Sequence, residues 1–300
     1  MPIKKMKVMI SKLPKNPWWG HGTPMYENNP AMKEGNVPNQ DIVEFEMDML
    51  SHLFHKLPVE VVELDFPYIL DQHNFDTRKH DFVFVRDLFI SNRKGEMVIS
   101  CFRERERQME ADIMQVILNA RGYKTHRLSD ACDAYAEGGE FYYCKNENIL
   151  FAGECRNNRK GSEQTAGLLN VDKLIILKSD AFHLDTIFTP VFDKQNDLAA
   201  MIACTELMTS VSVNELREFG KKKDIPLVEV TPDDAIGTKD ELGDFSVNCL
   251  PLPGYLVGPS RFREKRVEQL LQSLGILHIT VPLTQYRLSG GAVHCATNEL

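Results

Sequence analysis

One cysteine near the C-terminus has the setting of a reactive thiol. Residues 289–295 read Ser-Gly-Gly-Ala-Val-His-Cys, so Cys295 follows two glycines and a histidine. The glycines permit a tight turn and a close approach of backbone to a ligand. A cysteine buried for packing alone more often lies inside an apolar helix or strand. Cys295 is therefore a candidate nucleophile, provided that a histidine and a carboxylate meet it in space.

His183 and Asp185 are the first candidates for that role. They are separated by one leucine and lie between two apolar runs. If this segment is a strand, residues two apart face the same side, and a base and a carboxylate enter one pocket. The alternative is a satisfied His-Asp pair at the surface.

Two further stretches carry carboxylates. Arg86 and Asp87 interrupt the apolar run 82–90, which we expect to be a strand. Charges in so apolar a segment are costly unless they are paired or lie at a strand end. The run therefore indicates either a functional site or an Arg86–Asp87 pair at a sheet edge. Glu137 precedes Gly138-Gly139, which fits a bend beside a site or a plain turn before a strand.

Arginines follow in two places. Arg156 comes after an apolar run and stands among small polar residues, where a guanidinium fork can grip a carboxylate. Residues 102–107 read Phe-Arg-Glu-Arg-Glu-Arg, which is typical of a solvated charge run in which one arginine could turn inward.

The composition limits the class of protein. The 300 residues are 43% hydrophobic and 26% charged, which is typical of a globular protein with a large core. The net charge of -8 argues against nucleic acid or an anionic membrane as the main partner. Residues 1–9 lack the apolar core of a signal peptide, and no stretch is long enough to cross a membrane. The seven cysteines are scattered without a C-x-x-C pair, which favours reduced thiols in the cytoplasm over disulfides or a zinc site.

The elements that must position these residues repeat along the chain. Five helix-then-strand units are predicted, and further strand-like runs lie between them. Their ranges are 41–57 with 59–64, 106–120 with 124–128, 162–169 with 173–177, 212–222 with 226–230, and 264–274 with 278–283. Such α/β repetition favours a closed radial arrangement in a single domain, 1–300. An open doubly wound sheet is the alternative, but no glycine-rich phosphate fingerprint follows a first strand. Residues 14–40, with Trp18 and Trp19, are expected to form a lid or a surface loop.

The order of these signals resembles one known family. Arg-Asp, Glu-Gly-Gly, Arg-Asn, His-x-Asp and Gly-Gly-x-x-His-Cys follow one another over residues 81–297. This order resembles the guanidine-modifying, or pentein, superfamily, which includes arginine deiminase, agmatine deiminase, dimethylarginine dimethylaminohydrolase and the glycine amidinotransferases. The resemblance implies a five-bladed α/β propeller with its site in a central channel.

The resemblance also implies a role for each residue. Cys295 corresponds to the nucleophile, His183 to the general acid/base and Glu137 to the carboxylate beside it. Asp87 and Asp185 correspond to the two carboxylates that hold the guanidinium. Arg156 corresponds to a clamp for a substrate carboxylate, and Arg105 to a weaker second clamp.

These roles imply covalent chemistry on a guanidino compound such as arginine or a methylated arginine. Attack by Cys295 as a thiolate, at a pKa lowered by a protonated histidine, gives an amidino-cysteine intermediate. Water then yields a ureido product plus ammonia or amine, and no cofactor or metal is needed. The alternatives are an amidinotransferase, which passes the group to an amine, and a non-catalytic binding protein of the same fold. Arg86-Asp87 and Asp185 favour arginine deiminase and the amidinotransferases, whereas the chain length favours the dimethylarginine enzymes. The sequence leaves formation of a homo-oligomer open.

Overall fold

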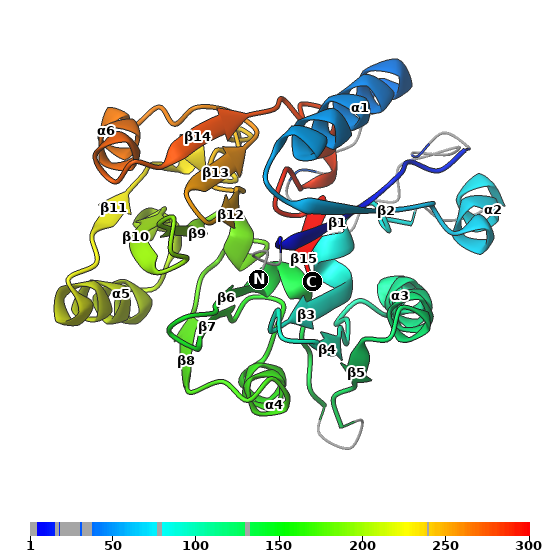
Figure 1. Cartoon of the computed structure of the whole chain (residues 1–300), viewed down its shortest axis with the longest axis horizontal. Helices are drawn as coiled ribbons and strands as arrows, with labels where there is room; N and C mark the ends of the chain where they lie inside the picture. The colour runs from blue at the N-terminus through cyan, green and yellow to red at the C-terminus, as the bar shows by residue number, and fades with distance from the viewer. Residues whose placement is uncertain are drawn as a thin grey trace.

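The computed structural model describes residues 5–15, 18, 31, 38–76, 80–129, 133–238 and 240–300. These residues form five separate three-stranded sheets. Figure 1 shows the sheets arranged around a common centre, with the helices on the periphery. The fold is therefore a mixed α/β fold built of small sheets.

Four of the sheets repeat one pattern, in which an antiparallel hairpin is followed by a helix and a third, parallel strand. Their elements, in chain order, are β3 (Phe89–Ser91), β4 (Glu96–Ile99), α3 (Gln108–Ala120) and β5 (Lys124–His126); β6 (Phe141–Cys144), β7 (Ile149–Gly153), α4 (Arg159–Leu168) and β8 (Lys173–Leu177); β9 (Phe188–Phe192), β10 (Leu198–Ala203), α5 (Ser210–Lys223) and β11 (Leu227–Glu229); β12 (Leu250–Leu252), β13 (Tyr255–Gly258), α6 (Lys265–Ser273) and β14 (Leu277–Thr280).

The remaining sheet joins the two ends of the described chain. Its elements are β1 (Lys7–Ser11), α1 (Gln40–Lys56), β2 (Glu60–Leu64) and the C-terminal β15 (Thr297–Glu299). β15 lies antiparallel to β1, in the position that the first hairpin strand has in the other sheets. A further helix, α2 (Tyr68–Asp76), follows β2.

Each sheet has one edge strand in which every residue is buried: β3, β6, β9, β12 and β15. We call these the inner strands. Three of them are preceded by a short 3-10 turn, at Val85–Leu88, Gly138–Glu140 and Leu184–Thr186. The helices pack their apolar sides on the sheets, as the spacing of Val43, Leu50 and Phe54 in α1 shows.

Two segments that were predicted as strands contain 3-10 turns instead. The run 82–90 is not a continuous strand, because residues 85–88 form a 3-10 turn and only 89–91 are extended. His183 and Asp185 do not share a strand face either, because His183 caps the 3-10 turn 184–186. The five predicted helix-strand units are confirmed with boundaries shifted by a few residues, and β10 was not predicted. Within the described residues, no helix is long and apolar enough to cross a membrane.

Candidate active site

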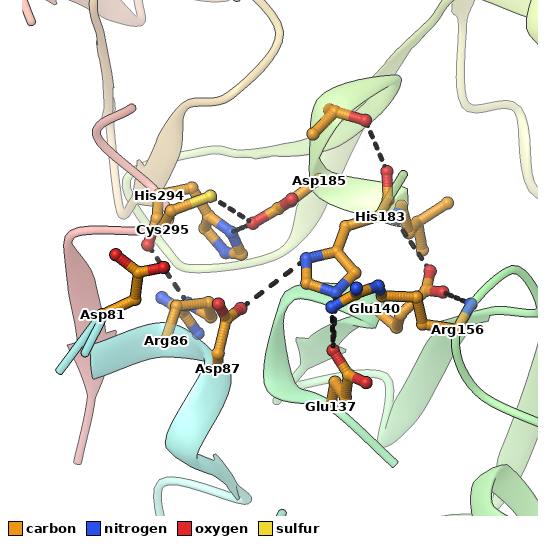
Figure 2. Close-up of polar contacts among 12 residues, drawn as sticks. Asp81, Arg86, Asp87, Glu137, Glu140, Arg156, His183, Asp185, His294 and Cys295 are labelled. Carbon is orange, nitrogen blue, oxygen red and sulfur yellow. Dashed lines mark hydrogen bonds and ion pairs between the residues drawn. The ribbon is translucent and has the colours of Figure 1, made fainter. Parts of the chain in front are cut away.

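The segments before the inner strands supply one cluster of buried polar side chains (Figure 2). Asp87 precedes β3, Glu137 precedes β6, His183 and Asp185 precede β9, and Cys295 precedes β15. Four different sheets thus deliver five of the predicted site residues to one place. The segment before β12 adds Asn248, which the sequence analysis did not single out.

The thiol of Cys295 lies between an amide and a carboxylate. Its Sγ is 3.2 Å from Asp185 Oδ2, and Asn248 Nδ2 donates to it over 3.1 Å. Asn248 Oδ1 accepts from the backbone N–H groups of Ala292, His294 and Cys295. One amide therefore fixes both the sulfur and the backbone turn that carries it.

The two carboxylate oxygens of Asp185 differ in their hydrogen bonding. Oδ2 accepts from Cys295 and lies 2.8 Å from His294 Nδ1, whose ring stacks on Tyr142. Oδ1 is buried and has no hydrogen-bond partner among the described residues. Burial and Arg86 hold the pKa of His294 well below its usual value, so its ring is neutral and donates from Nδ1.

His183 lies between two further carboxylates. Its Nε2 is 2.9 Å from Glu137 Oε2, and its Nδ1 is 3.7 Å from Asp87 Oδ1. Arg156 donates from Nη1 to the same oxygen of Glu137 over 3.1 Å, and its guanidinium lies 4.4 Å from the centre of the Phe182 ring. The predicted pairing of His183 with Glu137 is thus present, and Arg156 adjoins it.

Asp87 also has one oxygen that accepts no hydrogen bond. Oδ2 accepts from Arg107 Nη1 over 2.7 Å, and Arg107 in turn is paired with the buried Glu110. Oδ1 has no hydrogen-bond partner within the described chain. The alternative of an Arg86–Asp87 pair is wrong, because Arg86 pairs with Glu299 of β15 and Asp87 pairs with Arg107.

Arg105 is not in this cluster. Its side chain is exposed, whereas Arg107, two residues later, is buried against Asp87. The charge run does turn one arginine inward, but it is Arg107, because residues 105–107 form a 3-10 turn before α3.

Glu140 holds the segments of the site together. Its Oε1 accepts from the backbone N–H of Cys155, Arg156 and Asn157, and its Oε2 accepts from Leu184 N over 2.8 Å. A buried carboxylate with four backbone donors ties the turn before β6 to the loop of Arg156 and to the turn of His183.

Burial and charge set the protonation of the cluster. Burial acts against the charged form of Glu137, but Arg156 and His183 outweigh it and lower its pKa to about 2. Burial alone would lower the pKa of His183, but Asp87 and Glu137 raise it overall. Burial raises the pKa of Asp185 to about 7. Burial, with the charges of Asp185 and Asp87, raises the pKa of Cys295 well above its usual value, which contradicts the expected low pKa. At rest the thiol is protonated, and His183 favours its cationic form.

The cluster encloses a small cavity. Its volume is about 10 Å³, room for roughly one water molecule. It is lined by Asp81, Phe84, Asp87, Arg107, Arg156, Phe182, His183, Ser289, Gly290 and Cys295. Trp18 packs on Phe84 and donates from Nε1 to the carbonyl of His80, so this part of the 14–40 segment belongs to the core. Trp19 and most of the predicted lid lie outside the described residues.

The described residues contain no group of three His, Cys, Asp or Glu side chains placed to hold a metal ion. Glu110, Glu140 and Asn248 were missed because their sequence signal is an ordinary polar residue. What makes them notable is burial, which only the folded structure shows.

Comparisons with known proteins identify the family of this chain. The family model described as N,N dimethylarginine dimethylhydrolase, eukaryotic, matches residues 27–300. A comparison with curated proteins found no match. Similar solved structures include the substrate-bound N-terminal domain of ArgZ, an arginine dihydrolase from cyanobacteria, with 19% identity, a TM-score of 0.77, and 98% and 97% of the two chains covered.

Two others extend the comparison. Unliganded AgrE is 20% identical, with a TM-score of 0.79, and the match covers 98% of this chain and 39% of AgrE. A dimethylarginine dimethylaminohydrolase adduct with 4-chloro-2-hydroxymethylpyridine is 15% identical, with a TM-score of 0.68, and the match covers 99% and 100% of the two chains. This chain thus spans an entire dimethylarginine dimethylaminohydrolase but only about two-fifths of AgrE.

The family model defines a member of the guanidine-modifying superfamily and an enzyme of the guanidino-hydrolase class, and the fold is that of the similar solved structures. The chain belongs to the dimethylarginine dimethylhydrolase family, whose model covers all but its first 26 residues.

Proposed function

We propose that this protein hydrolyses a free guanidino compound, arginine or a methylated arginine, through a covalent amidino-cysteine intermediate on Cys295. The observation that carries the proposal is the pair of buried carboxylate oxygens that accept no hydrogen bond, Asp87 Oδ1 and Asp185 Oδ1, in the cluster that holds the thiol and His183. Asp87 Oδ1 has an ion pair with His183 Nδ1 at 3.7 Å and lacks a donor within hydrogen-bond distance. A buried carboxylate oxygen without a donor is costly, and the N–H groups of a guanidinium supply the missing donors.

The bound cation also activates the thiol. The pKa of Cys295 is raised by burial and by two negative charges, so a positive charge between Asp87 and Asp185 lowers it again. As the cation binds, the thiol proton, which points toward Asp185 Oδ2, leaves to solvent, so Asp185 stays ionised beside the guanidinium. Substrate binding therefore generates the thiolate only when there is a carbon for it to attack.

The reaction then proceeds in two steps. The thiolate attacks the guanidinium carbon, a C–S bond forms, and His183 gives its proton to the departing nitrogen as the C–N bond breaks. Ammonia or an amine leaves. Neutral His183 next takes a proton from water, the hydroxide attacks the amidino carbon, and the C–S bond breaks to release a ureido product and regenerate the thiol.

Arg156 is proposed to hold the carboxylate of the substrate. It lines the cavity and is already oriented by Glu137 and the Phe182 ring. Arg105, which is exposed, is not proposed for this role. We also infer that the five sheets are the five blades of one propeller domain, which the repeated hairpin-helix-strand pattern supports.

Intact-protein mass spectrometry tests the proposal. Wild type and Cys295→Ser are quenched in acid during turnover with arginine, agmatine and methylated arginines. We expect an amidino adduct on wild type only, together with a ureido product. Transfer of the amidino group to an added amine would instead establish an amidinotransferase. No adduct and no product from any compound would leave a binding protein of this fold.

A further inference from the structure

A second cavity lies at the opposite ends of the inner strands from the active site. Each inner strand begins at a site segment and runs to a turn that lines this cavity: residues 93–95 after β3, 145–146 after β6, 194–196 after β9, Pro253 after β12 and Leu300 after β15. We call it the basic bowl. Leu300, at the end marked C, lies near the centre of the ring of sheets in Figure 1. With strands of three to five residues, the bowl is about 10–17 Å from the thiol.

The basic bowl is large and carries one sign of charge. Its volume is about 850 Å³, within the range of ligand pockets. Its lining side chains include six cations and no Asp or Glu from the described chain: Lys5, Lys7, Arg93, Lys94, Lys145 and Lys194. Lys7 pairs with Glu60, and Lys145 donates to the carbonyl of Arg93. The protein as a whole has a net charge of -8, so this cavity has the opposite sign of charge from the rest of the molecule.

Arg93 is the anchor of the basic bowl. It is 9% exposed, its Nη2 donates to the carbonyl of Tyr143 over 2.7 Å, and its guanidinium lies over the Phe192 ring. Its Nη1 is buried and has no hydrogen-bond partner among the described residues. The residue adopts a left-handed backbone, φ 53°, held by a bond from its N–H to Ser91 Oγ. The charge of Arg93 also acts on the buried Glu299, whose pKa it helps to lower, but its Nη1 donor is left for a further acceptor such as a bound anion.

We propose that the basic bowl binds a small molecule with clustered phosphate groups. Five lysines and one arginine place six positive charges around one cavity, and lysine ammonium groups bind phosphate as point charges. An anion with several charges close together suits this arrangement better than a single carboxylate does. Tyr123, Leu252 and Tyr255 line the same cavity and offer an apolar wall to an organic part. The bowl is separated from the active site by the buried Arg86–Glu299 pair, so it is not a route for the guanidino substrate.

Isothermal titration calorimetry tests this inference. The full chain is titrated in separate runs with tripolyphosphate, ADP and citrate. We expect saturable binding of tripolyphosphate or ADP, and the tighter of the two distinguishes a bare polyphosphate from a nucleotide. Arg93→Gln should weaken binding about tenfold or more, as for loss of a charge-assisted bond. Lys94→Gln/Lys194→Gln, at two exposed positions, should weaken it similarly without affecting folding.

The control is Lys221→Gln/Lys222→Gln, which removes two exposed charges from α5. Its binding should equal that of wild type. No binding of either phosphate compound, equal weakening by the control pair, or equally tight binding of citrate would overturn the proposal. Turnover of the guanidino substrate without added anion should be unchanged in Lys94→Gln/Lys194→Gln, which separates this site from the active site.

Discussion

The charged groups around Cys295 favour the protonated thiol in the empty protein, because burial, Asp185 and Asp87 raise its pKa. The thiol is protonated, Asp185 titrates near neutral pH, and two carboxylate oxygens lack donors. On the proposed function, a bound guanidinium supplies the donors that the two oxygens lack and offsets the negative charge beside the thiol.

Glu137→Gln should move the alkaline limb of the pH profile. His183 must be protonated to serve the leaving nitrogen, and Glu137 is one of two carboxylates that raise its pKa. Loss of that charge lowers the pKa of His183, so kcat/KM should fall at lower pH than in wild type. Glu218→Gln, exposed on α5, is the control. A lower but unshifted profile would contradict this assignment.

Asp185→Asn should alter how stability depends on pH. Folding raises the pKa of Asp185 from 3.8 to about 7, so its favourable contribution is complete below pH 3.8 and is lost as pH rises through 7. Relative to wild type, the variant should gain on the order of a few kcal/mol of unfolding free energy between pH 4.5 and 8. Urea unfolding across this range measures the difference. The exposed Asp172→Asn is the control, and its unfolding free energy should follow that of wild type at every pH. The same behaviour in Asp185→Asn would show that folding does not raise the pKa of Asp185.

At the scale of elements, the short turns before the inner strands position the chemistry. A Cβ on Gly139 would lie 2.7 Å from His183 Nδ1 and 2.8 Å from Asp87 Oδ1. The glycine thus allows the turn before β6 to pass beneath both side chains. The Glu-Gly-Gly motif is needed as much for its second glycine as for its carboxylate.

Gly139→Ala should therefore lower kcat about 100-fold, because displacement of a catalytic group by about 1 Å has effects of that size. Gly167→Ala in α4 is the matched control, since a Cβ there meets nothing within 4 Å. The control should retain activity and gain up to about 1 kcal/mol of stability. Steady-state kinetics and thermal unfolding separate the two variants, and full activity of Gly139→Ala would refute the assignment.

The sequence predicted the site residues better than it predicted their elements. The motifs identified Asp87, Glu137, His183, Asp185 and Cys295, and the structure brings these together. Yet 82–90 and 183–185 are not strands, because apolar residues around a buried 3-10 turn have the same composition as a buried strand. Arg105 was preferred to Arg107 because sequence spacing cannot show which arginine of a charge run is buried.

At the scale of the whole molecule, the C-terminal strand β15 links the sheet of β1 and β2 to the segment before β3. Arg86, before β3, pairs with Glu299 of β15 and donates to Asn298 Oδ1. Asn298 Nδ2 in turn donates to the carbonyls of Val85, Arg86 and Phe89. The last strand is thus tied both to the first sheet and to the segment that carries Asp87.

Arg86→Gln should cost about 3–5 kcal/mol of unfolding free energy, because it leaves Glu299 buried without its partner. The double variant Arg86→Gln/Glu299→Gln should recover part of that loss. Urea unfolding of wild type, both single variants and the double variant gives the coupling energy. Strictly additive losses would mean that the pair does not act as a unit.

The nearly closed cavity around Cys295 has a consequence for labelling the protein. A neutral alkylating reagent finds a protonated thiol that is 3% exposed, whereas Cys101 and Cys155 are partly accessible. An amidine-bearing reagent carries a positive charge and N–H donors, which the free oxygens of Asp87 and Asp185 can accept. Cys295 is therefore a poor target for general thiol reagents, and on the proposed function we expect an amidine probe to label it selectively in a mixture of proteins.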